Sequence, residues 1–178
     1  MKRFAVIAII ISVIFSVCAC SGYADDSEII GALGELLPKS KYLYSAVYGD
    51  ILEHGLPDDT GYCLVEDEEL TSISQIKEAL YTVFTPEYAD IICNTAFRGV
   101  QTDDGYISAK FMEREGKLYV NPSTTEDFAT PRDFDISSAS VKEKNLYMAK
   151  VEISHNGTVI EVILQYMDGK WLIDSPVF

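Results

Sequence analysis

The sequence predicts an α+β fold in which helices from the N-terminal half pack on an antiparallel sheet from the C-terminal half. Apolar residues recur at helical spacing between residues 25 and 97. After residue 105, runs that alternate apolar and polar residues are separated by glycine-containing turns. The chain of 178 residues is long enough for one domain with a substantial core, and it shows no internal repeat. We therefore expect a single domain over residues 21–178, after a processed segment at residues 1–20.

Four helices are predicted in the first part of the chain. Residues 25–37 form a helix capped by Asp26 or Ser27 and interrupted by Pro38, and a second helix carries Tyr44, Val47, Ile51 and Leu52 and stops at Gly55. Ser72 and Gln75 have the spacing of a capping box before the apolar face of residues 72–84. Thr85 as the cap and Pro86 at the first helical position then start the fourth helix.

Residues 146–173 predict a three-stranded meander that ends a curved antiparallel sheet. Asn156-Gly157 and Asp168-Gly169 are typical two-residue hairpin turns. The two turns pair Ile153 with Ile160, Val151 with Val162, Ala149 with Leu164, Tyr147 with Tyr166, Tyr166 with Trp171 and Leu164 with Ile173. Both turns place the same apolar set on one face, and a slip of one residue would move it to the other face. We expect this face to pack on the helices of residues 72–97 and the opposite face, with Glu152 beside Glu161, to be solvated.

The remaining segments are predicted as short strands and loops. Residues 62–65 and 136–142 are predicted as strands, and residues 106–112 and 118–120 as a hairpin around Glu115-Gly116. The acidic run of residues 66–69 is interpreted as a solvated loop. Residues 121–135 form the longest stretch without periodicity, and long ordered loops are often functional.

The first twenty residues are typical of an export signal. Lys2 and Arg3 precede an apolar run over residues 4–17 that is short for a membrane span. The residues Val-Cys-Ala-Cys at 17–20, followed by Ser-Gly, resemble a bacterial lipobox, which would make Cys20 the lipidated first residue of the mature protein. Ordinary cleavage after Ala24 is the alternative. Both predict a protein outside the cytoplasmic membrane, either lipid-anchored on its outer face or secreted to the cell wall.

The formal charge of −14 excludes nucleic acid as an expected partner and favours basic proteins. Loss of Lys2 and Arg3 with the signal leaves 12 basic against 28 acidic residues, a charge of −16. The alternative role of this acidity is solubility alone.

No catalytic, metal-binding or cofactor-binding set is recognisable. Cys63 and Cys93 could form a disulfide in an oxidising compartment, or could be two buried free thiols. The histidines, His54 and His155, have no pattern that couples them to a cysteine nucleophile. Neither a phosphate-binding glycine loop nor a calcium loop is present. We therefore expect a binding protein without cofactors or a metal, and not an enzyme.

Two resemblances refine this expectation. The helices followed by a sheet that ends in DGKWLID resemble the NTF2-like and cystatin-like α+β group. From about Glu66 onward, the segments SISQIKEALYTVFTPEYADII, EGKLYVNPS, SVKEKNLYMAKVEI and QYMDGKWLID resemble the IseA-type inhibitors of D,L-endopeptidases. The chain departs from that family in the loop NPSTTEDFATPRDFD, which lacks glycine, and in its lipobox.

The closer resemblance implies an extracytoplasmic inhibitor of peptidoglycan D,L-endopeptidase autolysins of the NlpC/P60 cysteine-peptidase class. Glu126, Asp127 and Asp133 in the long loop are the expected contacts near the enzyme's cleft; their alternative role is loop solubility. The alternative function, from a different class, is an NTF2-like lipoprotein that binds a small molecule in an apolar sheet pocket.

Overall fold

A computed structural model of the chain describes residues 24–102, 105–124 and 132–177, which form the predicted α+β fold. The helices in these ranges are α2 (Asp26–Tyr48), α3 (Ile73–Val83), α4 (Pro86–Arg98) and the short 3-10 helix η1 (Pro122–Thr124). The strands are β1 (His54–Pro57), β2 (Cys63–Val65), β3 (Val100–Thr102), β4 (Gly105–Ile107), β5 (Phe111–Arg114), β6 (Lys117–Val120), β7 (Asp135–Lys144), β8 (Met148–His155), β9 (Thr158–Met167) and β10 (Lys170–Ile173).

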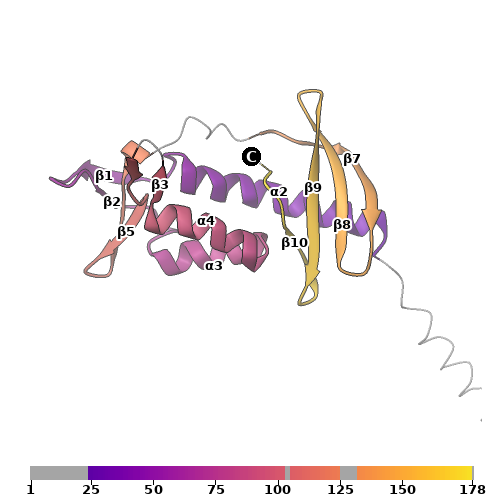
Figure 1. Ribbon diagram of the computed structural model, residues 1–178, viewed down its shortest axis with the longest axis horizontal. Coiled ribbons are helices and arrows are strands. Elements are labelled where there is room, and N and C mark those ends of the chain that lie inside the picture. The colour runs from indigo at the N-terminus through magenta and orange to yellow at the C-terminus, as the bar shows by residue number, and fades with distance from the viewer. Residues whose placement is uncertain (1–23, 103–104, 125–131, 178) are drawn as a thin grey trace, which may run out of the picture.

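The strands of the described residues form antiparallel sheets at opposite ends of an elongated molecule. One sheet has the strand order β1-β2-β6-β5 and the other the order β10-β9-β8-β7, while β3 and β4 form a separate hairpin. Figure 1 shows α2 running along the molecule from behind the β7–β10 sheet toward the N-terminal sheet, with α3 and α4 beside its C-terminal part. One continuous apolar core joins both ends. The helices therefore act as a bridge between two sheets rather than as a layer on a single one.

Helix α2 differs from its prediction at both ends and in the middle. Asp25 is the N-cap and accepts a hydrogen bond from Glu28 N at 2.8 Å, in place of Asp26 or Ser27. The helix continues through Pro38 and ends at Gly49, so the predicted break at Pro38 and the predicted stop at Gly55 are wrong. Its buried residues lie on both sides of Pro38: Ile29, Leu33, Leu36, Leu37, Leu43, Ala46 and Val47. Burial of this stripe outweighs the cost of an exposed proline in a helix.

Helices α3 and α4 begin as the sequence predicts. Ser72 Oγ accepts from Gln75 N at 3.1 Å, and Thr85 Oγ1 accepts from Tyr88 N at 3.4 Å. The reciprocal half of the capping box is shifted by one residue, because Gln75 Oε1 accepts from Thr71 N. Phe84, between the two helices, forms a parallel bridge with Ile173 at the end of β10. The junction between α3 and α4 is thereby attached to the C-terminal sheet.

The register of the C-terminal meander is confirmed. Ile153 lies opposite Ile160, Val151 opposite Val162, Ala149 opposite Leu164, Tyr166 opposite Trp171, Leu164 opposite Ile173, and Glu152 opposite Glu161. Tyr147 precedes β8, and its carbonyl accepts from Tyr166 N at 2.8 Å. The turn residues Asn156 and Asp168 and the glycines after them all have positive φ, as this hairpin type requires. β7 adds a fourth strand, slightly longer than predicted.

The C-terminal sheet packs on α2 as well as on α3, so the prediction that its apolar face packs on the helices of residues 72–97 is incomplete. Its main helical contacts are those of α2 with β7 and β10, and those of α3 with β10. Gly34 of α2 approaches Ile136 of β7, and Lys144 of β7 forms an ion pair with Asp26 at 2.8 Å. The sequence did not indicate this partner because an uninterrupted α2 was not expected.

The N-terminal sheet also differs from expectation in detail. β2 and the β5–β6 hairpin around Glu115-Gly116 are confirmed. Residues 106 and 107 belong to the separate β3–β4 hairpin rather than to β5. β1 lies where the second helix was expected to end, and it pairs with β2.

Candidate binding surface along helix α2

Asp133 is the one predicted contact residue that lies within the described residues; Glu126 and Asp127 lie outside them. The Asp133 side chain is 86% exposed, and its carboxylate forms an ion pair with Lys41 of α2. The hydrogen bond from Lys41 lowers the pKa of Asp133, which stays ionised. His155 Nδ1 lies 2.8 Å from the Asp133 carbonyl oxygen, at the end of β8. These contacts hold Asp133 beside a hollow of about 320 Å³ that Leu37, Arg132 and Ile136 also line.

A larger hollow of about 630 Å³ lies between α2, α3 and the acidic segment before α3. Its apolar lining comes from Pro38, Tyr42, Leu43, Leu70, Ala79 and Val83, and its polar lining from Lys39, Glu69, Gln75, Glu78 and Thr82. The pKa of the Tyr42 phenol is raised, mainly because the side chain is partly buried and then because of the nearby charges of Asp67 and Glu69. The hollow thus combines an apolar floor with an acidic rim.

The acidic run of residues 66–69, predicted as a solvated loop, helps to build this hollow. Asp67 Oδ1 accepts hydrogen bonds from the backbone N–H groups of Glu69 and Leu70, both at 2.8 Å. This turn places Leu70 in the core while Glu69 stays exposed on the rim. The hollow could not be predicted from the sequence, since an acidic run alone gives no sign of the apolar surface beside it.

A third hollow of about 510 Å³ lies between α2 and the β9–β10 hairpin. Gly31, Ala32, Leu36, Tyr166 and Trp171 line it, together with the charged residues Glu28, Glu35, Lys39 and Lys170. Trp171 is 6% exposed, and the Tyr166 ring lies 5.2 Å from its ring centroid. The hollow shares Lys39 and Thr82 with the larger one, so the two are neighbours along α2.

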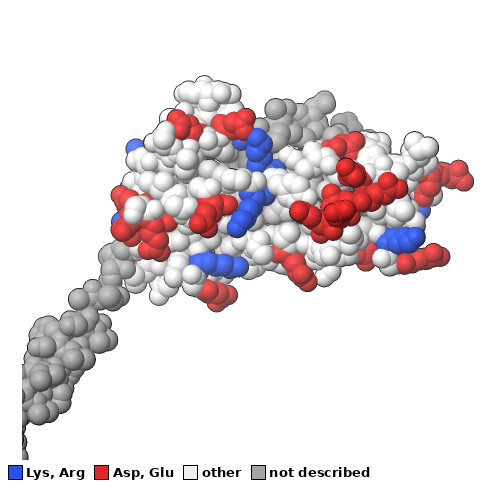
Figure 2. Space-filling view, turned by 180° about the vertical axis from the view of Figure 1, so that it is seen from behind, with Lys and Arg blue, Asp and Glu red and all other residues white. Residues whose placement is uncertain are grey.

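Acidic side chains dominate the face shown in Figure 2. They gather in clusters that a narrow band of Lys and Arg side chains separates. Such an arrangement attracts cationic partners and repels anionic polymers.

The two histidines and the two described cysteines are each accounted for by local contacts. His54 Nε2 lies 3.1 Å from Asp50 Oδ1, and the Gly55 carbonyl beside Nδ1 is the main cause of its raised pKa. Cys63 in β2 and Cys93 in α4 are buried free thiols, and burial raises the pKa of both. The disulfide considered for this pair is therefore not formed in the structure, because each cysteine fills apolar space in its own element.

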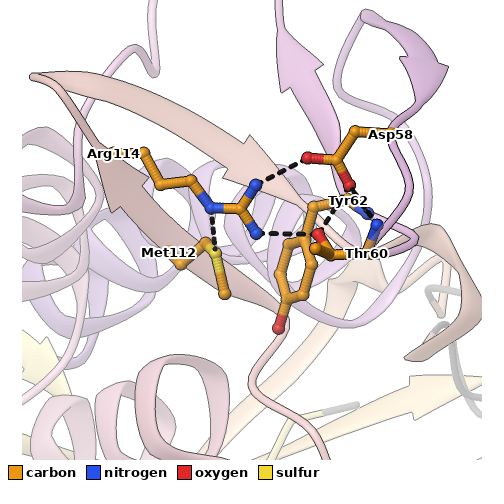
Figure 3. A network of polar contacts seen from close by, with 5 residues as sticks. All are labelled: Asp58, Thr60, Tyr62, Met112 and Arg114. Carbon is orange, nitrogen blue, oxygen red and sulfur yellow. Dashed lines mark hydrogen bonds and ion pairs between the residues drawn. The ribbon is translucent and has the colours of Figure 1, made fainter.

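Arg114 joins two segments of the N-terminal sheet in a compact polar network (Figure 3). Its guanidinium donates to Asp58 Oδ2 at 2.6 Å and to Thr60 Oγ1 at 2.8 Å. The same group lies 5.5 Å from the Tyr62 ring centroid and 5.2 Å from that of Tyr119. Hydrogen bonds from Thr60 above all, and then from Arg114, lower the pKa of Asp58 to about 2. The network fastens the turn after β1 to β5, which is a structural role.

Neither a metal-ligating cluster nor a membrane-spanning helix occurs among the described residues. No group of three or more His, Cys, Asp or Glu side chains there is arranged to hold a metal ion. None of the helices described has both the length and the apolar character needed to cross a bilayer. No protein-family model, curated protein or solved structure matches the chain.

Proposed function

We propose that the mature protein is an extracytoplasmic inhibitor of peptidoglycan D,L-endopeptidases of the NlpC/P60 class, and that it binds near their active-site cleft. Three features of the sequence support this: the export signal, the segments from Glu66 onward that resemble IseA-type inhibitors, and the strongly negative charge. Cys20, outside the described residues, would carry the lipid that retains the protein at the outer face of the cell membrane.

The observation that carries the proposal is the exposed acidic surface around α2. Asp133 lies beside this helix, in the segment before β7, where it pairs with Lys41. Glu69 and Glu78 line the hollow between α2 and α3. These carboxylates stand on a scaffold whose core is continuous, so a partner meets a preformed surface. An acidic surface of this kind would steer the protein toward a basic hydrolase and away from anionic wall polymers. Glu126 and Asp127, which lie outside the described residues, are the other two expected contacts.

The alternative function, a small-molecule site within the sheet, has less support. Ala149, Val151, Ile153, Val162 and Leu164 on the inner face of the sheet are each 1% exposed or less. This face is filled by the core and leaves no room for a ligand at those positions. A helix laid across an antiparallel sheet is nevertheless compatible with an NTF2-like or cystatin-like fold, and we propose that relationship for the C-terminal part.

A binding experiment tests the partner. The purified domain, immobilised, is expected to retain an NlpC/P60 hydrolase from cell-wall extracts, and added salt should slow association, because the Debye length shrinks from about 8 Å at physiological ionic strength to about 3 Å at 1 M. The triple variant Glu126→Gln, Asp127→Asn, Asp133→Asn should retain less enzyme. The control is Glu143→Gln with Glu161→Gln, which neutralises exposed acids on the C-terminal sheet. Retention that is equal for wild type and triple variant would remove these residues from the interface.

A further inference from the structure

The two larger hollows beside α2 adjoin each other, and we name them together the trough. Lys39 and Thr82 line both of them and stand where they meet. On α2, the lining extends from Ser27 in one hollow to Leu43 in the other. At a rise of about 1.5 Å per residue, this stretch of helix is about 24 Å long. An extended polypeptide of about seven residues covers the same distance at about 3.3 Å per residue. The trough therefore has the length of a short peptide segment rather than of one small molecule.

Its chemistry favours a basic segment. Glu28, Glu35, Glu69 and Glu78 line the trough and are all exposed. In the part of the chain that the structure describes, none of these four glutamates forms an ion pair. Lys39 and Lys170 are the two basic residues of the lining. The lining thus has an excess of negative charge that a cationic ligand would offset.

The apolar part of the lining favours a peptide ligand in which apolar and basic side chains alternate. Tyr42, Leu43 and Leu70 lie in one hollow, and Leu36, Tyr166 and Trp171 in the other. Successive side chains of an extended peptide point to opposite sides. Apolar side chains at alternate positions could then fill the two hollows while basic side chains between them face the glutamates.

We propose that this trough binds one extended polypeptide segment in which basic and apolar residues alternate. The trough shares Glu69 and Glu78 with the surface proposed for inhibition. The inference goes beyond that proposal, because it assigns a ligand class to the trough, which does not contain Asp133, and its test uses no hydrolase. Failure of one proposal therefore leaves the other standing.

Trp171 provides a local readout, since it is the single tryptophan of the chain and lines the trough. The probe is a nine-residue peptide, blocked at both ends, in which lysine and leucine alternate. Titration is expected to change the Trp171 emission in a saturable way. The control peptide has glutamate in place of every lysine and is expected to leave the emission unchanged.

A steric variant locates the ligand without loss of the fold. A Cβ at Gly31 meets no atom within 4 Å, and this glycine lies inside α2, in the turns near its N-terminus. Gly31→Leu should fold at least as stably as wild type, because glycine is unfavourable inside a helix. Its side chain would occupy the hollow beside Trp171, and we expect the affinity for the lysine-leucine peptide to fall by about tenfold or more.

Charge variants test the rim in the same titration. Glu69→Gln with Glu78→Gln should weaken peptide binding about two- to tenfold, whereas Glu143→Gln with Glu161→Gln, which removes the same charge elsewhere, should leave binding nearly unchanged. Equal binding of both peptides, or undiminished binding by Gly31→Leu, would overturn the proposal. It would also be overturned if the lysine-leucine peptide had no effect on the Trp171 emission. A change of that emission by the small anionic dye 8-anilinonaphthalene-1-sulfonate would in that case show that the trough is a small-molecule site.

Discussion

The contact between Asp58 and Arg114 joins residues that are 56 positions apart in the sequence. Neither residue lies in a recognisable motif, and in the sequence Asp58 is simply one of two aspartates in a turn. The interaction exists because the β1–β2 and β5–β6 hairpins share a sheet, in which β2 pairs with β6. Local sequence patterns indicated β2 and the β5–β6 hairpin, but neither β1 nor which hairpin lies beside which. Such a network could therefore not be predicted before the sheet order was known.

This network predicts a specific pH dependence. The pKa of Asp58 is lowered in the folded state from its ordinary value of 3.8 to about 2. The ionised Asp58 carboxylate therefore stabilises the folded protein. This stabilisation is complete at pH values above the unfolded-state pKa of 3.8, and it is lost as the pH falls from 3.8 toward about 2. In urea unfolding at a series of pH values, Asp58→Asn should lower the wild-type stability above this window, and the two proteins should converge below it. A difference that does not change with pH would show that the Asp58 charge contributes nothing.

Backbone conformation gives a second test at the residue scale. Gly31 lies inside α2 with open space around its Cα, so Gly31→Ala should stabilise the protein by about 0.5–1 kcal/mol. Gly116 also has open space, but its φ of 74° is one that alanine rarely adopts, so Gly116→Ala should destabilise. Thermal unfolding of the two variants gives the signs. If both substitutions shift stability in the same direction, the backbone explanation is wrong.

At the scale of elements, turn chemistry and periodicity predicted the C-terminal meander correctly. Asn156-Gly157 and Asp168-Gly169 fix the strand ends, and the alternating apolar residues fix the face. Pro38 shows where the same reasoning fails. The proline rule describes a local cost, whereas the buried residues on both sides of Pro38 belong to a core that forms only in the complete fold. The hollows beside α2 were missed for the same reason, since they depend on where a continuous α2 lies.

The buried face of the meander leads to a prediction about stability. Val162 is fully buried on β9, and Val162→Ala should lower the free energy of unfolding by about 1–3 kcal/mol through lost burial and a residual cavity. Val159 on the same strand is 61% exposed, and Val159→Ala should change it by less than about 0.5 kcal/mol. Chemical denaturation of both variants provides the comparison. Similar costs at the two positions would contradict the assigned face.

At the scale of the whole molecule, two sheets joined by α2 present acidic surface on a continuous core. Composition predicted the negative charge but not its placement. Asp133, predicted as a loop contact, is exposed yet paired with Lys41, so part of its charge is already offset within the chain. Glu69 and Glu78, which the sequence analysis did not select, have no such ion pair in the part of the chain that the structure describes. We therefore expect the glutamates beside α3 to contribute more to electrostatic attraction than Asp133 alone.

Inhibition itself is the most direct test of the proposed function. A purified NlpC/P60 D,L-endopeptidase digests isolated cell walls while the loss of turbidity is followed at increasing concentrations of the mature domain. Digestion is expected to slow in a saturable way. Added salt is expected to weaken this effect more than it changes the activity of the enzyme alone. Unchanged digestion at a large molar excess of the folded domain, for several enzymes of this class, would contradict the proposed function.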